Sequence, residues 1–351
     1  MKIKLAGDQD IVAWNNYITN HIDSTPYHNY AWKQSIENAY GFECPYLLAQ
    51  DDAGSIIGVL PLVKIAAPIM TGKLCSLPYC DLGGCLASDR QTEERLIDSA
   101  IELFREHRLS VFEYRTARHI QVQDDAQLLN QKVRMLLELP DSSEELISSF
   151  KAKLRSQIRK AEKNGLTYQL GNSPELVTQF YDVIANNMKL LGSPVHSKKW
   201  YQKICQYYGD NVVISIVMFK GKVAGAGLIL INGDKVSIPW ASTIRKFNPL
   251  APNMLLYWSL LTKATDMECR QFDFGRSSYG EGTYRFKQQW GAKPVLLEWK
   301  YLSMGSKQEF HIQQATISKS ISRLLAESVW RKLPLYFTIA LGSNIRKYIT
   351  L

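Results

Sequence analysis

Hydrophobic positions recur along the chain in two similar series of predicted elements. In the first half, apolar residues at 47–50 and 56–60 flank an Asp/Gly turn and predict a β-hairpin. In the second half, apolar runs at 213–217 and 223–228 flank a Lys/Gly turn at 220–222 and predict a second one. The same local pattern therefore occurs in both halves of the chain.

The similarity continues beyond the two hairpins. Three further pairs of predicted elements correspond: strand 73–76 with 235–238, helix 94–107 with 253–268, and strand 111–115 with 272–276. The offset stays at roughly 160 residues, which duplication of one α/β unit would produce. Pro140 and an Asp/Ser cluster then precede a new helix. We predict an N-terminal domain at 1–140, a C-terminal domain at 141–305 and a helical basic tail at 306–351.

The tail has a pattern of its own. It predicts a helix over 317–330 with apolar residues on one side, namely Ile317, Ile321, Leu324, Leu325 and Val329. An apolar and aromatic run at 333–337 and a basic stretch at 346–348 follow. Such a tail can lie on the anionic inner face of a membrane. It can equally dock on the second domain or on a partner subunit.

Length and composition support the two-domain interpretation. A chain of 351 residues exceeds the size at which one core usually keeps growing. With 46% hydrophobic and 21% charged residues, the composition is that of an ordinary globular protein. No apolar run approaches the roughly 18 residues of a membrane-spanning helix, and the N-terminus lacks a signal-peptide pattern. We therefore expect a cytoplasmic protein.

The six cysteines lack paired CxxC spacing. In a reducing compartment we expect them to be thiols, and we predict no metal site.

A net charge of +9 favours a polyanionic partner. Candidates are tRNA, a pyrophosphate-linked lipid precursor and an anionic membrane face. Basic residues concentrate on one predicted helix, around an apolar face that includes Leu154 and Ile158. They form a candidate phosphate- or tRNA-binding surface: Lys153, Arg155, Arg159, Lys160 and Lys163. The alternative is a solvated helix with an incidental excess of charge.

The richest stretch is the run FDFGRS at 272–277, followed by GTYRFKQQWG at 282–291. Alternating apolar residues predict a short buried strand that opens into a glycine-rich loop. Polar side chains then crowd the strand end, namely Arg276, Ser277, Lys287 and Gln288. We expect them to converge on a polar substrate.

This stretch resembles the signature of the FemAB-like aminoacyl and acyl transferases, particularly the branch associated with PEP-CTERM and exopolysaccharide systems. The basic segment 154–166 and the LGSPVHS run at 191–197 are also similar to that family, as are 60–62 and 81–84. The similarity covers roughly residues 25 to 302. It implies an α/β (α+β) fold with two tandem domains of the GNAT type, that is, the acyl-CoA N-acyltransferase fold.

The family also implies transfer of an aminoacyl or acyl group to an amine or hydroxyl, typically from a charged tRNA. A single GNAT fold normally holds the pyrophosphate of acyl-CoA with a glycine-rich loop at a helix N-terminus. Here the corresponding segment, 245–253, has no glycine and two prolines, which cannot donate backbone hydrogen bonds. The first repeat offers the acidic Asp81 instead. We therefore do not expect ordinary CoA binding.

Three residues are candidates for catalysis. Arg276 and Lys287 can neutralise a diphosphate or the oxyanion of acyl transfer, although an ion pair with Asp273 or Glu281 is the alternative. Asp81 can accept a proton from an attacking amine if burial raises its pKa. In a sharp Asp-Leu-Gly-Gly turn, it can instead cap the backbone.

Four further residues are candidates for acceptor binding. His196 follows Gly-Ser-Pro in a predicted loop and can contact the acceptor or simply lie on the surface. Trp240, Tyr284 and Trp290 can line a cleft for a sugar or base, or can pack in the core. A covalent intermediate on Cys80 or Cys85 is less favoured, since neither has a histidine partner in sequence.

The sequence thus predicts a FemAB-like transferase acting on a cell-envelope precursor, either a peptidoglycan stem peptide or a sugar amine of an exported polysaccharide. The expected donor is aminoacyl-tRNA, with no bound cofactor. One alternative is an N-acyltransferase that uses acyl-CoA or acyl carrier protein in polysaccharide or lipid tailoring. Another is a non-catalytic GNAT-like binding protein. The long helical arm of some peptidoglycan-bridge enzymes has no counterpart, because no extended heptad insertion interrupts either repeat.

Overall fold

The chain folds into two compact units, which are described separately below. The computed structural model describes residues 1–67, 70–118, 128–129, 131–305, 310–312 and 321–350. Unit 1 comprises Met1–Arg134, Val295–Thr316 and Tyr348–Leu351, and unit 2 comprises Met135–Pro294 and Ile317–Lys347.

This division differs from the predicted domains in its boundaries. The segment Val295–Thr316 belongs to unit 1, because its strand pairs antiparallel with an earlier strand of that unit, from Leu296↔Arg118 to Ser303↔Val111. The described part of the predicted tail is shared between the two units. Ile317 and the tail residues 306–309, 313–316, 318–320 and 351 lie outside the described residues.

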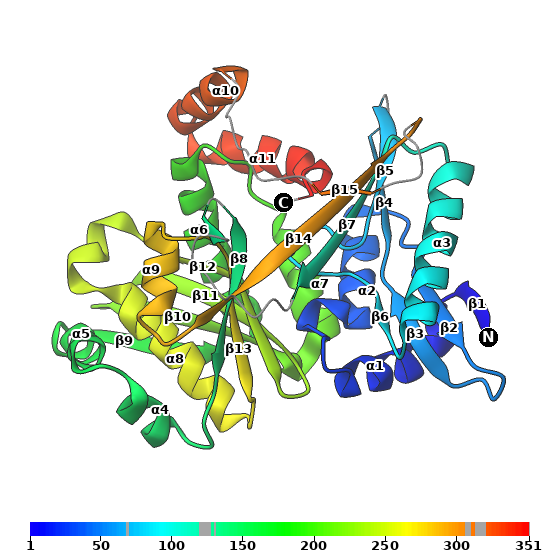
Figure 1. Ribbon diagram of the computed structural model, residues 1–351. Coiled ribbons are helices and arrows are strands. Elements are labelled where there is room, and N and C mark those ends of the chain that lie inside the picture. Colours follow the sequence, from blue (N-terminus) through cyan, green and yellow to red (C-terminus); the bar gives the residue numbers. More distant parts are fainter. Residues whose placement is uncertain (68–69, 119–127, 130, 306–309, 313–320, 351) are drawn as a thin grey trace. The chain divides into compact units, whose positions relative to one another are not determined.

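Unit 1 contains three helices and two groups of paired strands among the described residues (Figure 1). Its elements are β1 (Lys2–Leu5), α1 (Ile11–Asn20), α2 (Tyr30–Tyr40), β2 (Leu47–Gln50), β3 (Ile56–Leu60), β4 (Val63–Ala67), β5 (Met70–Cys75), β6 (Leu86–Ala87), α3 (Arg90–Glu106), β7 (Val111–Arg118), most of β14 (Lys293–Ser303) and β15 (His311–Ile312). The first group has the order β1-β2-β3-β6 and the second β4-β5-β7-β14, with β15 on β14. The predicted hairpin of β2 and β3 is confirmed. Leu96, Ala100 and Phe104 of α3 form part of the core beneath these strands.

Unit 2 is built around a twisted sheet of order β8-β13-β12-β11-β10-β9. Its elements are most of β8 (Lys132–Glu138), then α4 (Ser143–Ser149), α5 (Ala152–Lys163), β9 (Leu166–Gly171), α6 (Pro174–Leu191), α7 (Lys198–Tyr208), β10 (Val212–Phe219), β11 (Lys222–Asn232), β12 (Lys235–Thr243), α8 (Pro252–Asp266), β13 (Gln271–Ser278), α9 (Gly282–Gln288), α10 (Ile321–Lys332) and α11 (Leu335–Ile345). The predicted hairpin of β10 and β11 is confirmed. Both α6 and α8 pack on β11.

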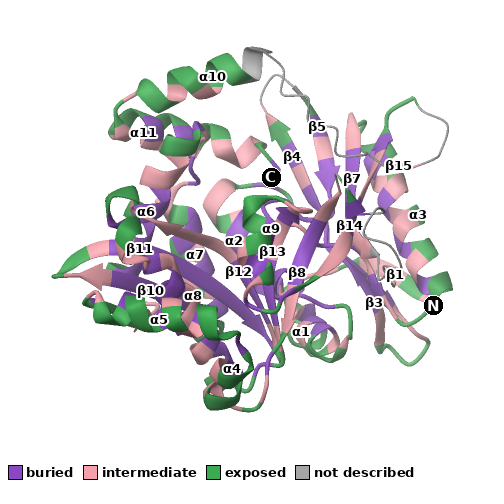
Figure 2. Ribbon diagram, turned by 60° about the vertical axis from the view of Figure 1, so that its left-hand side comes forward, coloured by how far each residue is buried: buried purple, intermediate pink, exposed green. Residues whose placement is uncertain are grey.

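Helix α6 shows how sequence signals fix the elements of unit 2. The Ser173 hydroxyl accepts a hydrogen bond from the backbone N–H of Leu176, and Pro174 occupies the first helical turn. At the other end Gly192 takes φ 75°, a left-handed conformation that favours glycine. Val177, Phe180 and Ile184 face the core, at the spacing of one helical face. Buried and exposed residues alternate in a similar way along most of the helices in Figure 2.

Strands β12 and β13 are parallel, because the crossover helix α8 joins them. Their pairing covers Lys235↔Gln271 to Ser237↔Asp273, although β12 continues to Thr243 and β13 to Ser278. A β-bulge precedes the divergence: one extra residue of β12 lies opposite β11, in the stretch that holds Pro239. The two strands therefore separate after three pairs and leave an opening at their carboxyl ends.

Unit 1 repeats this arrangement with β5, α3 and β7. Its parallel pairing runs from Lys73↔Val111 to Cys75↔Glu113, so that Glu113 corresponds to Asp273 of unit 2. The sequence alignment paired residues 111–115 with 272–276, which is one residue out of register. Arg115 corresponds to Gly275 and not to Arg276. A slip of one residue turns each side chain to the other face of the strand. Arg115 in unit 1 and Arg276 in unit 2 are therefore not equivalent residues of the two repeats.

Candidate functional site

A cavity of about 400 Å³ opens where β12 leaves β13 in unit 2. Its volume is within the range of small-ligand pockets. Its walls come from the end of β12, the following segment, and helices α6, α8 and α9. The lining residues are Asn187, Leu190, Ala241, Ser242, Thr243, Arg245, Asn248, Asn253, Leu256, Tyr257 and Phe286. None of them is acidic, and Arg245 is the single cationic residue of this lining.

One wall is polar and is made by the segment that precedes α8. Residues Arg245–Leu250 form a short 3-10 helix, and Ala251 follows it with φ 61°, a left-handed conformation unusual for alanine. The Thr243 hydroxyl donates to the side-chain oxygen of Asn248 at 2.8 Å. Asn253 lies in the first turn of α8, directly after Pro252. Side-chain amides, a hydroxyl and a guanidinium thus occupy the place where a GNAT fold usually presents glycine backbone amides.

The opposite wall is aromatic and rests on the FDFGRS and GTYRFKQQWG motifs. The Tyr257 ring is stacked on Phe274 at 5.7 Å between centroids, and the edge of one ring meets the face of the other between Tyr257 and Phe286 at 5.0 Å. Trp290 supports Tyr257 from behind at 6.1 Å. Burial raises the pKa of the Tyr257 phenol to about 12, so the hydroxyl stays protonated at neutral pH.

Lys287 holds the end of β13 in place. The side chain is buried, and its ammonium donates to the carbonyl oxygens of Gly275 at 2.9 Å and Arg276 at 2.8 Å. The carboxylate of Asp273 accepts from the backbone N–H of Gly275 at 2.8 Å. Gly275 has φ 73°, and these contacts fix the turn that it makes. Lys287 therefore binds the motif's own backbone, and Arg276 contributes a carbonyl to that contact.

The other motif residues are mostly buried. Trp290 is fully buried against Phe150, at 5.5 Å between ring centroids, and belongs to the core. Tyr284 packs on Tyr279 at 4.7 Å and accepts from the exposed Gln288 at 3.5 Å. The hydroxyl of Ser277 is buried without a hydrogen-bond partner among the described residues.

His196 lies in a loop, as predicted, but the loop is buried. Its imidazole is surrounded by the rings of Trp200, Tyr201 and Trp240, at 5.7, 6.2 and 6.4 Å between centroids. Burial lowers the pKa of His196 well below its ordinary value, and the charge of Arg346 adds to this effect. His196 and Trp240 therefore pack together in one aromatic cluster of unit 2.

Asp81 belongs to unit 1, whereas the other two catalytic candidates belong to unit 2. Its backbone carbonyl accepts from the indole N–H of Trp299 at 3.0 Å. The nearby thiols of Cys80 and Cys85 have pKa values well above the ordinary value, since burial disfavours the thiolate. Neither thiol has the properties of a nucleophile.

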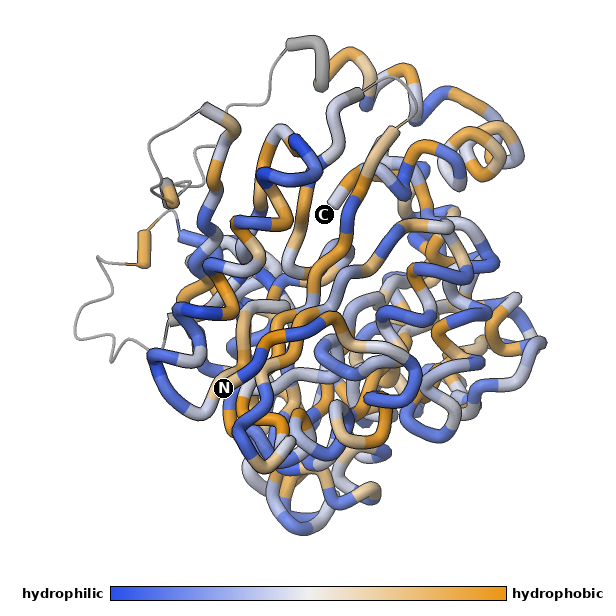
Figure 3. The backbone as a smooth tube through the Cα atoms, turned by 90° about the vertical axis from the view of Figure 1, so that its right-hand side faces the viewer, coloured by the Kyte–Doolittle hydropathy of each residue, from blue (hydrophilic) through white to orange (hydrophobic). Residues whose placement is uncertain are grey.

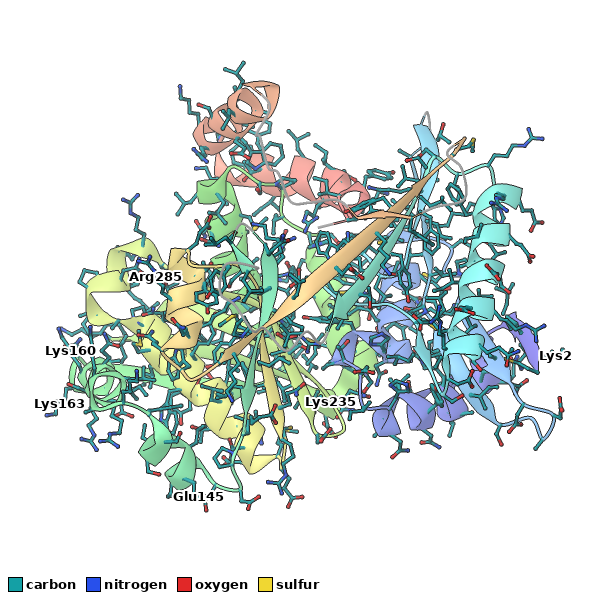
Figure 4. The ribbon with its side chains drawn as sticks, in the orientation of Figure 1. Lys2, Glu145, Lys160, Lys163, Lys235 and Arg285 are labelled. Carbon is teal, nitrogen blue, oxygen red and sulfur yellow. The ribbon has the colours of Figure 1, made fainter. Side chains whose placement is uncertain are left out.

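The predicted basic helix is α5. Its residues Lys153, Arg159, Lys160 and Lys163 are exposed, while Arg155 is half-buried and donates to the carbonyl of Ser148 at 3.2 Å. Figure 4 shows Lys160 and Lys163 extending outward from this helix. Just beyond α5, Asn164 donates to the carbonyl of Leu250 at 3.2 Å. The C-terminal end of α5 therefore lies beside the polar wall of the pocket.

Most of the pocket was not predicted residue by residue. Sequence analysis pointed to the segment 245–253 but selected no site residue from it, and it missed Asn187 and Tyr257 entirely. A polar segment with prolines before a helix, at the position of a known phosphate loop, was the available signal. Asn187 and Tyr257 lie in helices of ordinary composition and carry no such signal.

Comparison with known proteins places this pocket in a recognisable fold. Residues 148–288 match the family model of the acetyltransferase (GNAT) domain. The chain thus carries a GNAT acetyltransferase domain, which covers the pocket of unit 2 and supports the class of GNAT-type acyltransferases. No curated protein matches the sequence.

Solved structures extend the likeness to both units. A structure of FemX has a TM-score of 0.66 at 13% identity, over 84% of this chain and 95% of that one. A tandem GNAT protein from the clavulanic acid biosynthesis pathway has a TM-score of 0.54 at 12% identity, over 87% and 99%. L-PGS from Bacillus licheniformis has a TM-score of 0.54 at 10% identity, over 94% and 99%. The expected tandem GNAT fold is confirmed.

Proposed function

We propose that this protein transfers an aminoacyl group from aminoacyl-tRNA to an amine or hydroxyl of a cell-envelope precursor, with the aminoacyl end bound in the unit 2 pocket. The acceptor would be a peptidoglycan stem peptide or a sugar of an exported polysaccharide. The observation that carries the proposal is the polar wall at 245–253, which lines the pocket with side chains instead of glycine amides.

That wall suits an aminoacyl ester better than the pyrophosphate of CoA. Backbone amides of a glycine loop bind a pyrophosphate because several N–H groups point at it together. Pro249 and Pro252 remove two of those donors, and the 3-10 helix uses others internally, as in the bond from Ala251 N–H to Asn248 O. The amides of Asn187, Asn248 and Asn253 can both donate and accept, as an α-amino group and a ribose hydroxyl require.

The chemistry needs few groups from the protein. The acceptor nitrogen or oxygen attacks the ester carbonyl carbon of the donor, a new bond forms to that carbon, and the bond from it to the ribose oxygen breaks. The proton lost by the acceptor is finally carried by the ribose hydroxyl. Holding both reactants in place supplies much of the rate enhancement. Tyr257, protonated in the pocket, is suited to donate a hydrogen bond to the leaving oxygen.

The basic surface of α5 supports a nucleic-acid donor. Its exposed lysines and Arg159 lie next to the polar wall through the Asn164 contact. Positive side chains beside a pocket can bind the phosphodiester backbone of a nucleic acid without recognising its sequence.

A second candidate is N-acyl transfer from an acyl thioester. The matched acetyltransferase domain favours it, and Leu190, Leu256 and Phe286 give the pocket apolar surface for an acyl chain. Acyl carrier protein would avoid the need for a CoA pyrophosphate site. A non-catalytic GNAT-like binding protein would turn over neither donor.

Binding of charged total tRNA and of acyl-CoAs, measured across a salt series, tests these candidates. We expect saturable tRNA binding that weakens steeply with salt. Lys160→Glu with Lys163→Glu should weaken it by roughly tenfold or more. Lys2→Glu with Arg95→Glu, an equal change of charge on exposed residues of unit 1, should leave it near the wild-type value.

Transfer of radiolabelled amino acid from tRNA to isolated envelope precursors then tests catalysis. Thioester binding without tRNA binding would refute the aminoacyl-tRNA donor. Tight tRNA binding with no transfer to any precursor would refute the enzymatic role.

A further inference from the structure

Helix α11 presents its large apolar residues to the outside of unit 2. Tyr336, Phe337, Leu341 and Ile345 are between 44% and 66% exposed. The buried residues of this helix are the small Thr338 and Gly342, and a Cβ at Gly342 would lie 3.0 Å from the backbone of Val195. A helix that only covers a core shows the opposite distribution, with large apolar residues inward.

Helix α10 repeats this inversion. Leu324, Leu325 and Val329 are 48%, 62% and 61% exposed. These are residues of the apolar side that the sequence predicts. The helix docks on unit 2 with its other side, where Glu327 lies so close to Gly192 that a Cβ there would be 2.7 Å from the Glu327 carbonyl oxygen. Arg331 donates to the carbonyl of Leu191 at 3.3 Å.

Both helices thus expose apolar side chains on unit 2, and these exposed residues of α10 and α11 together are called the α10–α11 surface below. Figure 2 shows both helices largely in the colour of exposed residues. In Figure 3, the helix that follows the grey segment at the top carries hydrophobic stretches. Several large apolar side chains exposed on neighbouring helices are typical of an interaction site.

The charged residues of α10, α11 and the residues that directly follow them are mostly basic. In the sequence from residue 321 to 348 the single acidic residue is Glu327, which pairs with Arg331 at 3.6 Å and is 12% exposed. Arg331 and Lys332 are exposed at the end of α10, and Arg346 and Lys347 follow α11. Apolar and aromatic side chains flanked mainly by basic residues match the interface of an anionic bilayer.

The surface also continues to the pocket. Leu191 is 53% exposed and touches α10 through its carbonyl. Its neighbour Leu190 is 55% exposed and lines the pocket. A molecule held at the α10–α11 surface would therefore reach the pocket along the end of α6.

We propose that the α10–α11 surface docks unit 2 on a bilayer of anionic phospholipid and presents the pocket to acceptors held at that bilayer. The docking is independent of the function proposed above. The inference of a lipid-linked acceptor, in contrast, rests on that proposed function. In the described part of the chain, no helix combines the length and apolarity needed to cross a bilayer. The contact is interfacial, with Tyr336, Phe337 and Leu341 entering the headgroup region.

Sedimentation with lipid vesicles tests the docking. We expect the full-length protein to bind vesicles of equal phosphatidylglycerol and phosphatidylcholine, to bind pure phosphatidylcholine weakly, and to be partly released by salt. Leu325→Glu with Tyr336→Glu should lower the binding to anionic vesicles by roughly tenfold or more. Val12→Glu with Ile22→Glu changes two apolar residues of unit 1 that are even more exposed, at 72% and 84%, and this variant should bind as the wild type does.

Four outcomes would overturn the proposal. They are no binding of the wild type, equal binding by both double variants, equal binding to both kinds of vesicle, and a dimer in solution that only the Leu325→Glu/Tyr336→Glu variant abolishes. The last would identify a second copy as the occupant. Since all the substituted residues are exposed, unchanged melting temperatures will confirm that both variants fold. Vesicle binding without transfer from tRNA would refute the proposed function alone, whereas transfer without vesicle binding would refute the docking alone.

Discussion

Replacing Lys287 by methionine distinguishes a structural lysine from a catalytic one. Methionine keeps the apolar stem but removes the ammonium, which leaves the partly buried carbonyls of Gly275 and Arg276 without this donor. Hydrogen bonds from a charged donor contribute about 1.5–3 kcal/mol each. Two such bonds, partly coupled, give an expected loss of about 3 kcal/mol in the free energy of unfolding. For a unit of this size, that corresponds to a fall of roughly 6–12 °C in Tm.

Scanning calorimetry measures this change directly, with Arg285→Met as the control. Arg285 lies two residues earlier on α9, is exposed, and is labelled in Figure 4. We expect its replacement to change Tm by no more than about 2 °C, as for most surface substitutions. If Lys287→Met keeps the wild-type Tm and abolishes turnover, the lysine acts in the chemistry and our structural interpretation fails.

Three further changes are informative. Arg115→Met removes donors to the carbonyls of Leu77, Cys80 and Thr350 and leaves the carboxylate of Glu113 short of a partner; chemical denaturation should show a loss of about 3–5 kcal/mol, and a loss below about 1 kcal/mol would contradict this role. Gly192→Ala should loosen α10 and speed proteolysis of the tail, whereas Gly41→Ala, with a similar φ of 71° and no atom within 4 Å of the new Cβ, should not. Burial lowers the pKa of His28 to about 4. In the unfolded chain this imidazole takes up a proton near pH 6.5, whereas in the folded chain it stays neutral down to about pH 4. The contribution of His28 to the free energy of unfolding is therefore fully present above pH 6.5 and should decline by up to about 3 kcal/mol as the pH falls toward 4. His28→Asn should be less stable at pH 7 but flatten the dependence over this window, and an unchanged slope would refute the assignment.

Local patterns were enough to predict much of the fold. The hairpins β2–β3 and β10–β11 and the helices α3 and α8 follow from periodicity and turn residues, which depend on short segments only. The register of the two repeats was harder, since Val111 and Phe112 are both apolar and either can be matched to Phe272. Only the ladder pairs decide the match.

The candidate site was predicted only in part. The segment 245–253 was noted because its residues differ from a phosphate loop, but no site residue was predicted in it; its residues Arg245, Asn248 and Asn253 line the pocket. Lys287 and His196 read as polar residues available to a substrate, yet both are buried by elements distant in sequence or by neighbouring rings. Burial of a single polar residue depends on tertiary contacts, and no local pattern records those contacts.

The composition of unit 1 has a consequence for the order in which the chain folds. Its strand β7 pairs with β14. The guanidinium of Arg115 also donates to the carbonyl of Thr350, which lies 235 residues further along the chain. The segment 135–294, in contrast, holds every described strand of the unit 2 sheet apart from the first three residues of β8. During synthesis the middle of the chain can therefore form its native sheet first. Residues 1–134 cannot complete their strand pairing until the C-terminal segments have been synthesised. A fragment ending at 134 should remain prone to aggregation, whereas one spanning 135–294 should acquire protected amide hydrogens by itself.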